Sequence, residues 1–211
     1  MPLPRRAPPA VSHIVITLQS ISRRRPAMMA TTHVFVGLAA VAPVAYAAPD
    51  LAGPLAAGAI VGGLAPDVDL LLEHRRTLHF PVLGVAVAVP AVALAAVVPS
   101  SLTVAAAAFA VAAWLHAVTD ALGGGPEMDP WTDRSERAVY DHVRGRWIRP
   151  RRLVRYDGSP EDATLAVSLA VPVLLAFDGW ITAVVVAGLA ISIGYALLRR
   201  RLVAWLPDWL E

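Results

Sequence analysis

The sequence predicts an all-α protein, a polytopic membrane bundle of about six transmembrane helices. Two observations support this fold class. The 211-residue chain is 57% hydrophobic and only 16% charged, whereas about a quarter of the residues of a typical soluble domain are charged. In addition, the apolar residues form long uninterrupted blocks, and the charged residues collect in a few clusters between them. A soluble bundle with unusually apolar buried helices is the alternative.

Six apolar blocks follow one another along the chain. They are Val34–Ala48, Leu51–Ala65, Phe80–Val98, Leu102–Leu122, Ala163–Phe177 and Trp180–Leu198. A spanning helix needs about 20 residues, and the third, fourth and sixth blocks reach that length. The other three are short, so we expect each to extend by a turn or to thin the bilayer locally. Ala, Gly and Val dominate the blocks, which favours close packing of helices through small residues.

The chain divides into two parts by composition. Residues 1–29 are rich in Pro and Arg, and their short apolar stretch is too small for a signal-peptide core, so we expect a disordered or non-native extension. Met28 and Met29 offer an alternative start. Residues 30–211 form the membrane-embedded domain, with one large polar loop at 123–162. The absence of cysteine excludes disulfides and thiolate metal ligands.

The arginines predict the orientation of the bundle. If six helices alternate in direction, three connections lie on one side, at 49–52, 99–101 and 178–179, and they contain no basic residue. All 18 basic residues of the chain are arginines, and all fall on the other side. The positive-inside rule makes that side cytoplasmic. We therefore expect a multi-pass protein of the cell membrane with both termini in the cytoplasm.

Seven ionisable side chains border these apolar blocks. Such groups are costly near a bilayer, so each one suggests a functional role. The alternation of helix direction brings all seven to the cytoplasmic ends of the first four helices. They are His33, Asp67, Asp69, His74, His79, His116 and Asp120.

Imidazole together with carboxylate indicates a divalent metal ion, Zn, Mn or Fe. His116 and Asp120 are four residues apart and share one helix face. A turn at Pro66 would let Asp67 and Asp69 face the same site. The number of groups allows one or two ions. Each group also has a simpler interpretation, for example a buried His–Asp hydrogen bond or a carboxylate that ends a helix.

In order, the motifs are Thr-His in the first helix, Pro-Asp-x-Asp, His-Arg-x-x-x-His and His-x-x-x-Asp. This series, from Thr31 to Trp131, resembles the YdjM-like family of membrane-bound metal-dependent hydrolases, also described as LexA-binding, inner-membrane-associated hydrolases. The chain departs from the family pattern at Leu70, Leu78 and Phe80. The resemblance implies a metal site, and its matching positions are His33, Asp67, Asp69, His74, His79, His116 and Asp120.

The function expected from these features is hydrolysis of an ester or phosphoester in a lipid or amphiphile. Metal ligands would be His33, Asp67, Asp69, His79, His116 and Asp120. His74 would be a further ligand or a proton shuttle, and Arg75 could hold a phosphate with two hydrogen bonds or serve orientation in the membrane. The alternatives are a non-enzymatic metal-binding or transport protein and a structural scaffold.

The polar loop carries arginines and aromatic residues together. This mixture is found in nucleic-acid binding proteins, but a chain held in a bilayer uses it more simply on anionic headgroups. The lipid bilayer is therefore the expected partner, and nucleic acid is not.

Overall fold

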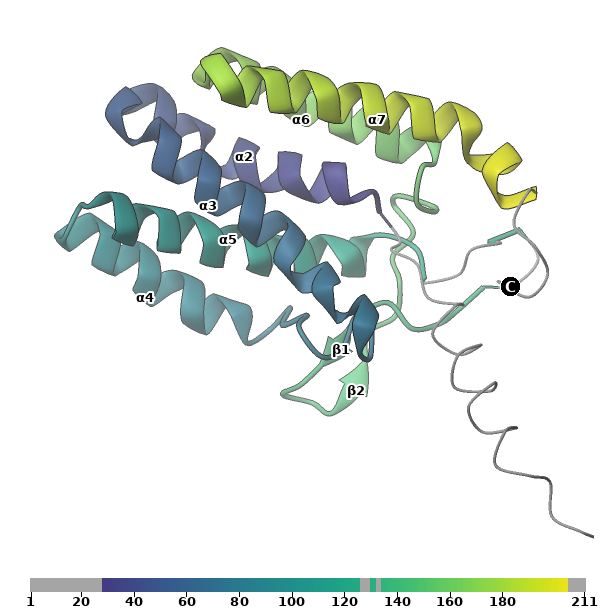
Figure 1. The fold of residues 1–211 in the computed structure, drawn as a ribbon. Coiled ribbons are helices and arrows are strands. Elements are labelled where there is room, and N and C mark those ends of the chain that lie inside the picture. Colours follow the sequence, from purple (N-terminus) through teal and green to yellow (C-terminus); the bar gives the residue numbers. More distant parts are fainter. Residues whose placement is uncertain (1–27, 126–129, 132–133, 205–211) are drawn as a thin grey trace, which may run out of the picture.

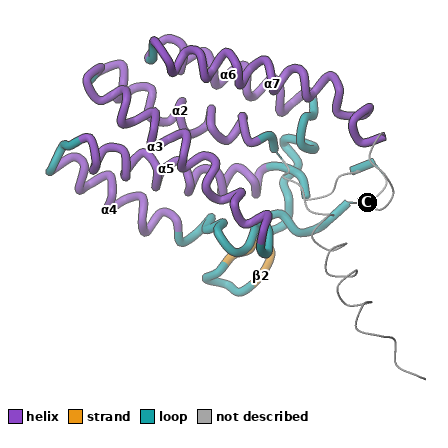
Figure 2. Tube along the Cα trace, in the orientation of Figure 1, coloured by secondary structure: helices purple, strands orange, loops and turns teal. Residues whose placement is uncertain are grey.

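The computed structural model describes residues 28–125, 130–131 and 134–204. Within these residues the secondary structure consists of helices and one short β-hairpin (Figure 1, Figure 2). The elements are α2 (Ala30–Ala47), η1 (Pro49–Leu51), α3 (Ala52–Leu64), η2 (Ala65–Leu71), α4 (Gly84–Val97), α5 (Ser101–Leu122), β1 (Tyr140–Asp141), β2 (Arg146–Trp147), α6 (Pro160–Ala176) and α7 (Gly179–Ala204). The six α-helices match the six apolar blocks in order.

The helices form three antiparallel pairs, α2–α3, α4–α5 and α6–α7 (Figure 1). Helix α5 is central, because α2, α3 and α4 all pack on it, while α6 packs on α2 and α7 on α6. The short turns within the pairs lie together at one end of the bundle. The opposite end, called the polar end below, holds η2, the segment that leads to α4, and the β1–β2 hairpin.

Small residues set the closest helix contact. A Cβ atom on Gly58 would lie 2.1 Å from the carbonyl oxygen of Ala105, and one on Gly62 would lie 2.3 Å from the carbonyl oxygen of Phe109. The two glycines are one helical turn apart, so α3 presents a smooth stripe on which the backbone of α5 rests. This contact fixes the polar ends of α3 and α5 side by side.

Four of the six expected spans meet the length and hydropathy of a transmembrane helix among the described residues. They are Ala30–Ala47, Pro49–Leu71, Ser101–Leu122 and Gly179–Leu202. The second block is longer than expected because 3-10 turns extend α3 at both ends. Helix α4 is shorter, since Pro81 lies in a turn that delays its start to Gly84 and leaves 14 residues. Several helices are thus apolar enough for a membrane, and six spans are not established.

The start of the folded region differs from expectation. The interpretation of 1–29 as an extension is wrong for its last two residues, because Met28 and Met29 are buried. The backbone N–H of Met29 donates to Oδ2 of Asp162 at 2.8 Å, and the Thr32 hydroxyl donates to Oδ1 at 2.7 Å. Asp162 therefore ties the start of α2 to the start of α6. Residues 1–27 lie outside the described part of the chain.

Candidate metal centre

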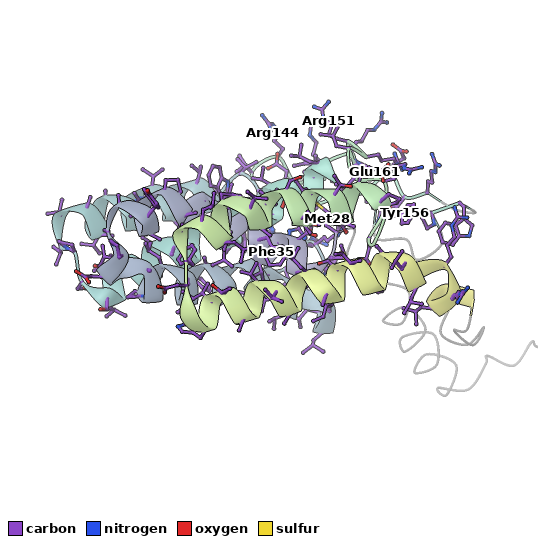
Figure 3. The ribbon with its side chains drawn as sticks, turned by 90° about the horizontal axis from the view of Figure 1, so that it is seen from above. Met28, Phe35, Arg144, Arg151, Tyr156 and Glu161 are labelled. Carbon is purple, nitrogen blue, oxygen red and sulfur yellow. The ribbon has the colours of Figure 1, made fainter. Side chains whose placement is uncertain are left out.

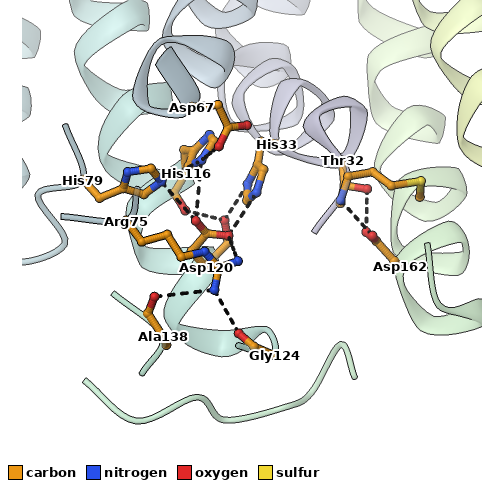
Figure 4. Close-up of polar contacts among 12 residues, drawn as sticks. Thr32, His33, Asp67, Arg75, His79, His116, Asp120, Gly124, Ala138 and Asp162 are labelled. Atoms are coloured by element: carbon orange, nitrogen blue, oxygen red, sulfur yellow. Dashed lines mark hydrogen bonds and ion pairs between the residues drawn. The ribbon is translucent and has the colours of Figure 1, made fainter. Parts of the chain in front are cut away.

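The seven His and Asp side chains expected to converge lie together at the polar end. Figure 4 shows five of them, His33, Asp67, His79, His116 and Asp120. The seven come from α2, η2, the segment between η2 and α4, and α5. All are fully or almost fully buried except Asp67, whose side chain is 12% exposed. The alternation of helix direction was therefore sufficient to predict this grouping.

His116 points its Nε2 atom into the cluster because its other nitrogen is held. Nδ1 of His116 donates to the carbonyl oxygen of Gly63 at 2.7 Å. A carbonyl oxygen can only accept, so the proton of neutral His116 is on Nδ1 and the lone pair is on Nε2. Gly63 also packs closely on α2, since a Cβ atom there would lie 3.0 Å from Cα of Val34.

Thr119 orients His33 so that, as in His116, Nδ1 is hydrogen-bonded and Nε2 faces the cluster. The Thr119 hydroxyl donates to the carbonyl oxygen of Leu115 at 2.8 Å, so its oxygen is available to accept from Nδ1 of His33 at 3.2 Å. The lone pair of His33 then lies on Nε2, which is 3.2 Å from Oδ1 of Asp120. The imidazole rings of His33 and His116 stack, with centroids 3.7 Å apart.

The third oriented imidazole is His79. Its Nδ1 donates to Oδ2 of Asp69 at 3.0 Å, which leaves Nε2 to face the cluster. This Nε2 atom lies 3.2 Å from Nε2 of His116 and 3.1 Å from Oδ2 of Asp120. Burial alone would lower the pKa of His79, but the hydrogen bonds and charges of Asp120 and Asp69 outweigh it and raise this pKa to about 9.

Apart from Nε2 of His79, which carries a proton when that imidazole is charged, the atoms at the centre offer lone pairs. Nε2 of His116 is 3.4 Å from Oδ1 of Asp67 and 3.7 Å from Oδ2 of Asp120. Within the described residues, Oδ1 of Asp67, Oδ2 of Asp120 and Nε2 of His33 have no hydrogen-bond partner. Buried lone pairs that face one another repel unless a cation lies between them. A proton on Nε2 of His79 satisfies part of this set, and a metal ion would satisfy all of it.

The spacing of these atoms fits a small divalent ion. Ligand distances of 2.0–2.1 Å in a tetrahedron place the ligand atoms about 3.4 Å apart. Four of the six separations among the ligand atoms of Asp67, His79, His116 and Asp120 lie between 3.1 and 3.7 Å. Asp67, His79 and His116 could therefore hold one ion, and His33, His116 and Asp120 form a second group of three that could hold another.

Asp69 is placed differently from the other expected ligands. Both of its oxygens accept hydrogen bonds on the side of His79 that faces away from the cluster centre. Oδ1 accepts from Nδ1 of His74 at 2.8 Å, and Oδ2 accepts from Nδ1 of His79 and from the backbone N–H of Leu78. A carboxylate that holds the far nitrogen of a metal-binding histidine is a common outer partner of metal sites. Asp69, His74 and His79 also form a possible ligand group of their own.

Arg75 is buried between the cluster and the polar loop (Figure 4). Its Nη1 donates to the carbonyl oxygens of Gly124 at 3.1 Å and Ala138 at 3.5 Å, and its Nη2 donates to Oδ1 of Asp120 at 3.4 Å. Its backbone has a positive φ of 62°, and its carbonyl accepts from the N–H of Tyr140. Its terminal nitrogens are thus used to fix Asp120 and the loop, whereas the sequence suggested a phosphate contact.

Two residues that orient the cluster were not expected from the sequence. Thr119 could have been noticed, because it lies three residues after His116 and one before Asp120. The role of the Gly63 carbonyl could not be predicted from the sequence, because every residue has a backbone carbonyl. No family model, curated protein or solved structure matches this chain.

Proposed function

We propose that the chain is a membrane-bound metal-dependent hydrolase that acts on an ester or phosphoester of a lipid or amphiphile. The observation that carries the proposal is the buried cluster of Asp67, His79, His116 and Asp120, in which neighbouring ligand atoms lie 3.1 to 3.7 Å apart. The resemblance of the motifs to the YdjM-like family adds the reaction type. One or two ions of Zn, Mn or Fe are the expected cofactor.

When bound, such an ion polarises a carbonyl or phosphoryl oxygen and acidifies water. The residues of the chain would bind the ion and transfer the proton. Asp67, His79, His116 and Asp120 would hold the ion, with His33 beside them. His74 has its Nδ1 on Asp69 and a buried Nε2 without a hydrogen-bond partner among the described residues. It would take up or release a proton at Nε2.

Hydrolysis of the ester or phosphoester requires no reactant other than water. The hydroxyl group of water adds to the acyl carbon or the phosphorus, and the proton goes to the oxygen that leaves. Arg75 holds Asp120 in place through its guanidinium group. It would therefore act as a positioning residue in this reaction.

The transport alternative lacks a path through the bundle. The buried charged and histidine side chains among the described residues all lie at the polar end, in or beside the candidate centre and the starts of α2 and α6. A transported ion needs polar groups across the bilayer. The scaffold alternative does not explain why Nε2 of His116, whose proton lies on Nδ1, faces a carboxylate oxygen of Asp67.

Elemental analysis of the purified full chain tests the metal site. We expect wild-type protein to hold Zn, Mn or Fe, and His116→Ala and Asp67→Ala to lose it. His142→Ala is the matched control, since His142 bonds to the Arg76 carbonyl outside the cluster. The proposal fails if wild type holds no transition metal after mild purification, or if both cluster variants retain it fully.

The proposed orientation has its own test. With the polar end in the cytoplasm, a reporter fused after Glu211 should give a cytoplasmic signal. An exterior signal would overturn this orientation and leave the metal centre unaffected.

A further inference from the structure

An apolar groove of about 550 Å³ runs between α4 and α5. Val87 and Ala91 form one wall, and Ala106, Ala110 and Ala113 form the other. The three alanines are four and three residues apart, so they lie along one face of α5. Their small side chains leave an apolar cavity between the two helices.

The groove ends beside the candidate metal centre. Leu78 and Phe80 line its mouth. His79, the residue between them, is fully buried in the cluster, so it faces the candidate centre while Leu78 and Phe80 face the groove. The indole Nε1 of Trp114 donates to the Pro81 carbonyl at 3.0 Å and fixes this segment to α5. One chain segment therefore separates the groove from the metal ligands.

A basic and aromatic surface covers the mouth. The rings of Phe80 and His142 lie 4.8 Å apart, and Nε2 of His142 donates to the Arg76 carbonyl at 2.6 Å. The Arg76 guanidinium lies over the ring of Tyr140, 4.5 Å from its centroid. Aromatic and arginine side chains together are typical of the interface between membrane and water.

The loop from 134 to 155, which contributes Tyr140 and His142 to this surface, is strongly positive. Between positions 134 and 155 the chain has eight arginines and two acidic residues. Figure 3 shows Arg144 and Arg151 projecting away from the helices. Arg146 is exposed on β2 and has no ion pair within the described residues. Such a surface favours an anionic headgroup by about 1 kcal/mol for each nearby arginine.

We infer that the substrate is an anionic phospholipid, with one acyl chain in the α4–α5 groove and its phosphate under the β1–β2 hairpin. This inference rests on the proposed function for the chemical step. It adds the substrate class and the route by which the scissile bond reaches the centre. The apolar walls of the groove bind the acyl chain of the lipid, and the arginines bind its phosphate. The ester bonds between the acyl chain and the phosphate then lie at the level of His79.

A second groove is the competing site. It has a volume of about 610 Å³, lies between α5 and α6, and is lined by Thr119, Glu161 and Leu165. One oxygen of Glu161 pairs with Arg155, and the other is buried without a hydrogen-bond partner in the described residues. A carboxylate at this position is unfavourable for a phosphate, which is why the α4–α5 groove is preferred.

Photolabelling in lipid nanodiscs tests this assignment without requiring turnover. The probe is phosphatidylglycerol with a diazirine in one acyl chain, compared with the matching phosphatidylcholine. We expect labels on α4 and α5, and a decrease of about tenfold in Ala106→Trp and Ala91→Trp, whose side chains fill the groove. Ala187→Trp, on the exposed face of α7, is the control. The metal content of each variant reports that it is folded.

The headgroup is tested separately. Arg146→Gln should reduce the preference for phosphatidylglycerol over phosphatidylcholine by about fivefold, the value of one arginine near an anionic surface. Equal labelling of the two lipids by wild type would overturn the anionic assignment. Labels confined to α5 and α6 would overturn the choice of groove.

The outcomes separate the two proposals. If phosphatidylglycerol labels α4 and α5 but is not hydrolysed by metal-loaded protein, the binding site stands and the hydrolase function falls. If lipid is hydrolysed while the groove variants keep both labelling and rate, the hydrolase function stands and this inference falls.

Discussion

The carbonyl oxygen of Gly63 accepts the Nδ1–H of His116 at 2.7 Å. This bond joins the end of α3 to the middle of the candidate centre and decides which nitrogen of His116 carries the lone pair. The geometry of the centre is therefore set by helix packing as much as by its own side chains.

Asp69→Asn tests whether Asp69 orients the imidazoles. An amide cannot accept from both His74 and His79, so His79 would lose its fixed tautomer and its available Nε2 lone pair. Loss of such an outer partner lowers metal affinity by about 10- to 100-fold. Metal titration of the purified chain measures this decrease. Glu73→Gln, in a more exposed ion pair with Arg76, should leave affinity unchanged. A variant that bound no metal at all would make Asp69 a direct ligand.

Metal binding should stabilise the folded chain. A ligand present at about 100 times its dissociation constant adds about 2.7 kcal/mol to the free energy of unfolding. Chelation should remove this increment from wild-type protein, as measured by unfolding in detergent. His116→Ala should show no response to chelator, whereas His142→Ala should respond like wild type. Equal responses from all three proteins would contradict a site at His116.

Gly62→Ala tests the contact between α3 and α5. Its Cβ would lie 2.3 Å from the Phe109 carbonyl oxygen, and overpacking of this kind costs about 1–3 kcal/mol. Gly53→Ala on the same helix meets no atom within 4 Å, so its stability should be unchanged or higher by up to about 1 kcal/mol. Unfolding of both variants in detergent gives the comparison. Equal stability would show that the helices can separate without cost.

Asp162→Asn tests the tie between α2 and α6. The carboxylate accepts from the backbone N–H groups of Met29 and Gly158 and from the Thr32 hydroxyl. An amide replaces one acceptor by a donor and leaves a buried donor unpaired, which costs about 1–3 kcal/mol. Asp50→Asn, at an exposed position in η1, is the control and should unfold like wild type. Equal unfolding of the two variants would argue against a structural role for Asp162.

The sequence predicted the order of the helices and the grouping of the seven side chains. Both depend on hydropathy and on the alternation of direction, which a sequence records. It did not predict the short α4, because the block from Phe80 reads as continuous although Pro81 keeps its first residues out of the helix. It also did not separate Asp67 from Asp69, since their roles depend on the 3-10 geometry of η2. The hydrogen-bond partners of His33 and His116, Thr119 and the Gly63 carbonyl, depend on contacts between helices that cannot be predicted from residue types alone.

The candidate centre lies at one end of the bundle and not at its middle. A lipid that reaches it through the α4–α5 groove would therefore come from a single leaflet. Lipids of the opposite leaflet would need to cross the bilayer first. Sustained turnover in a closed vesicle would then stop near half of the lipid unless a flippase or scramblase restored the supply.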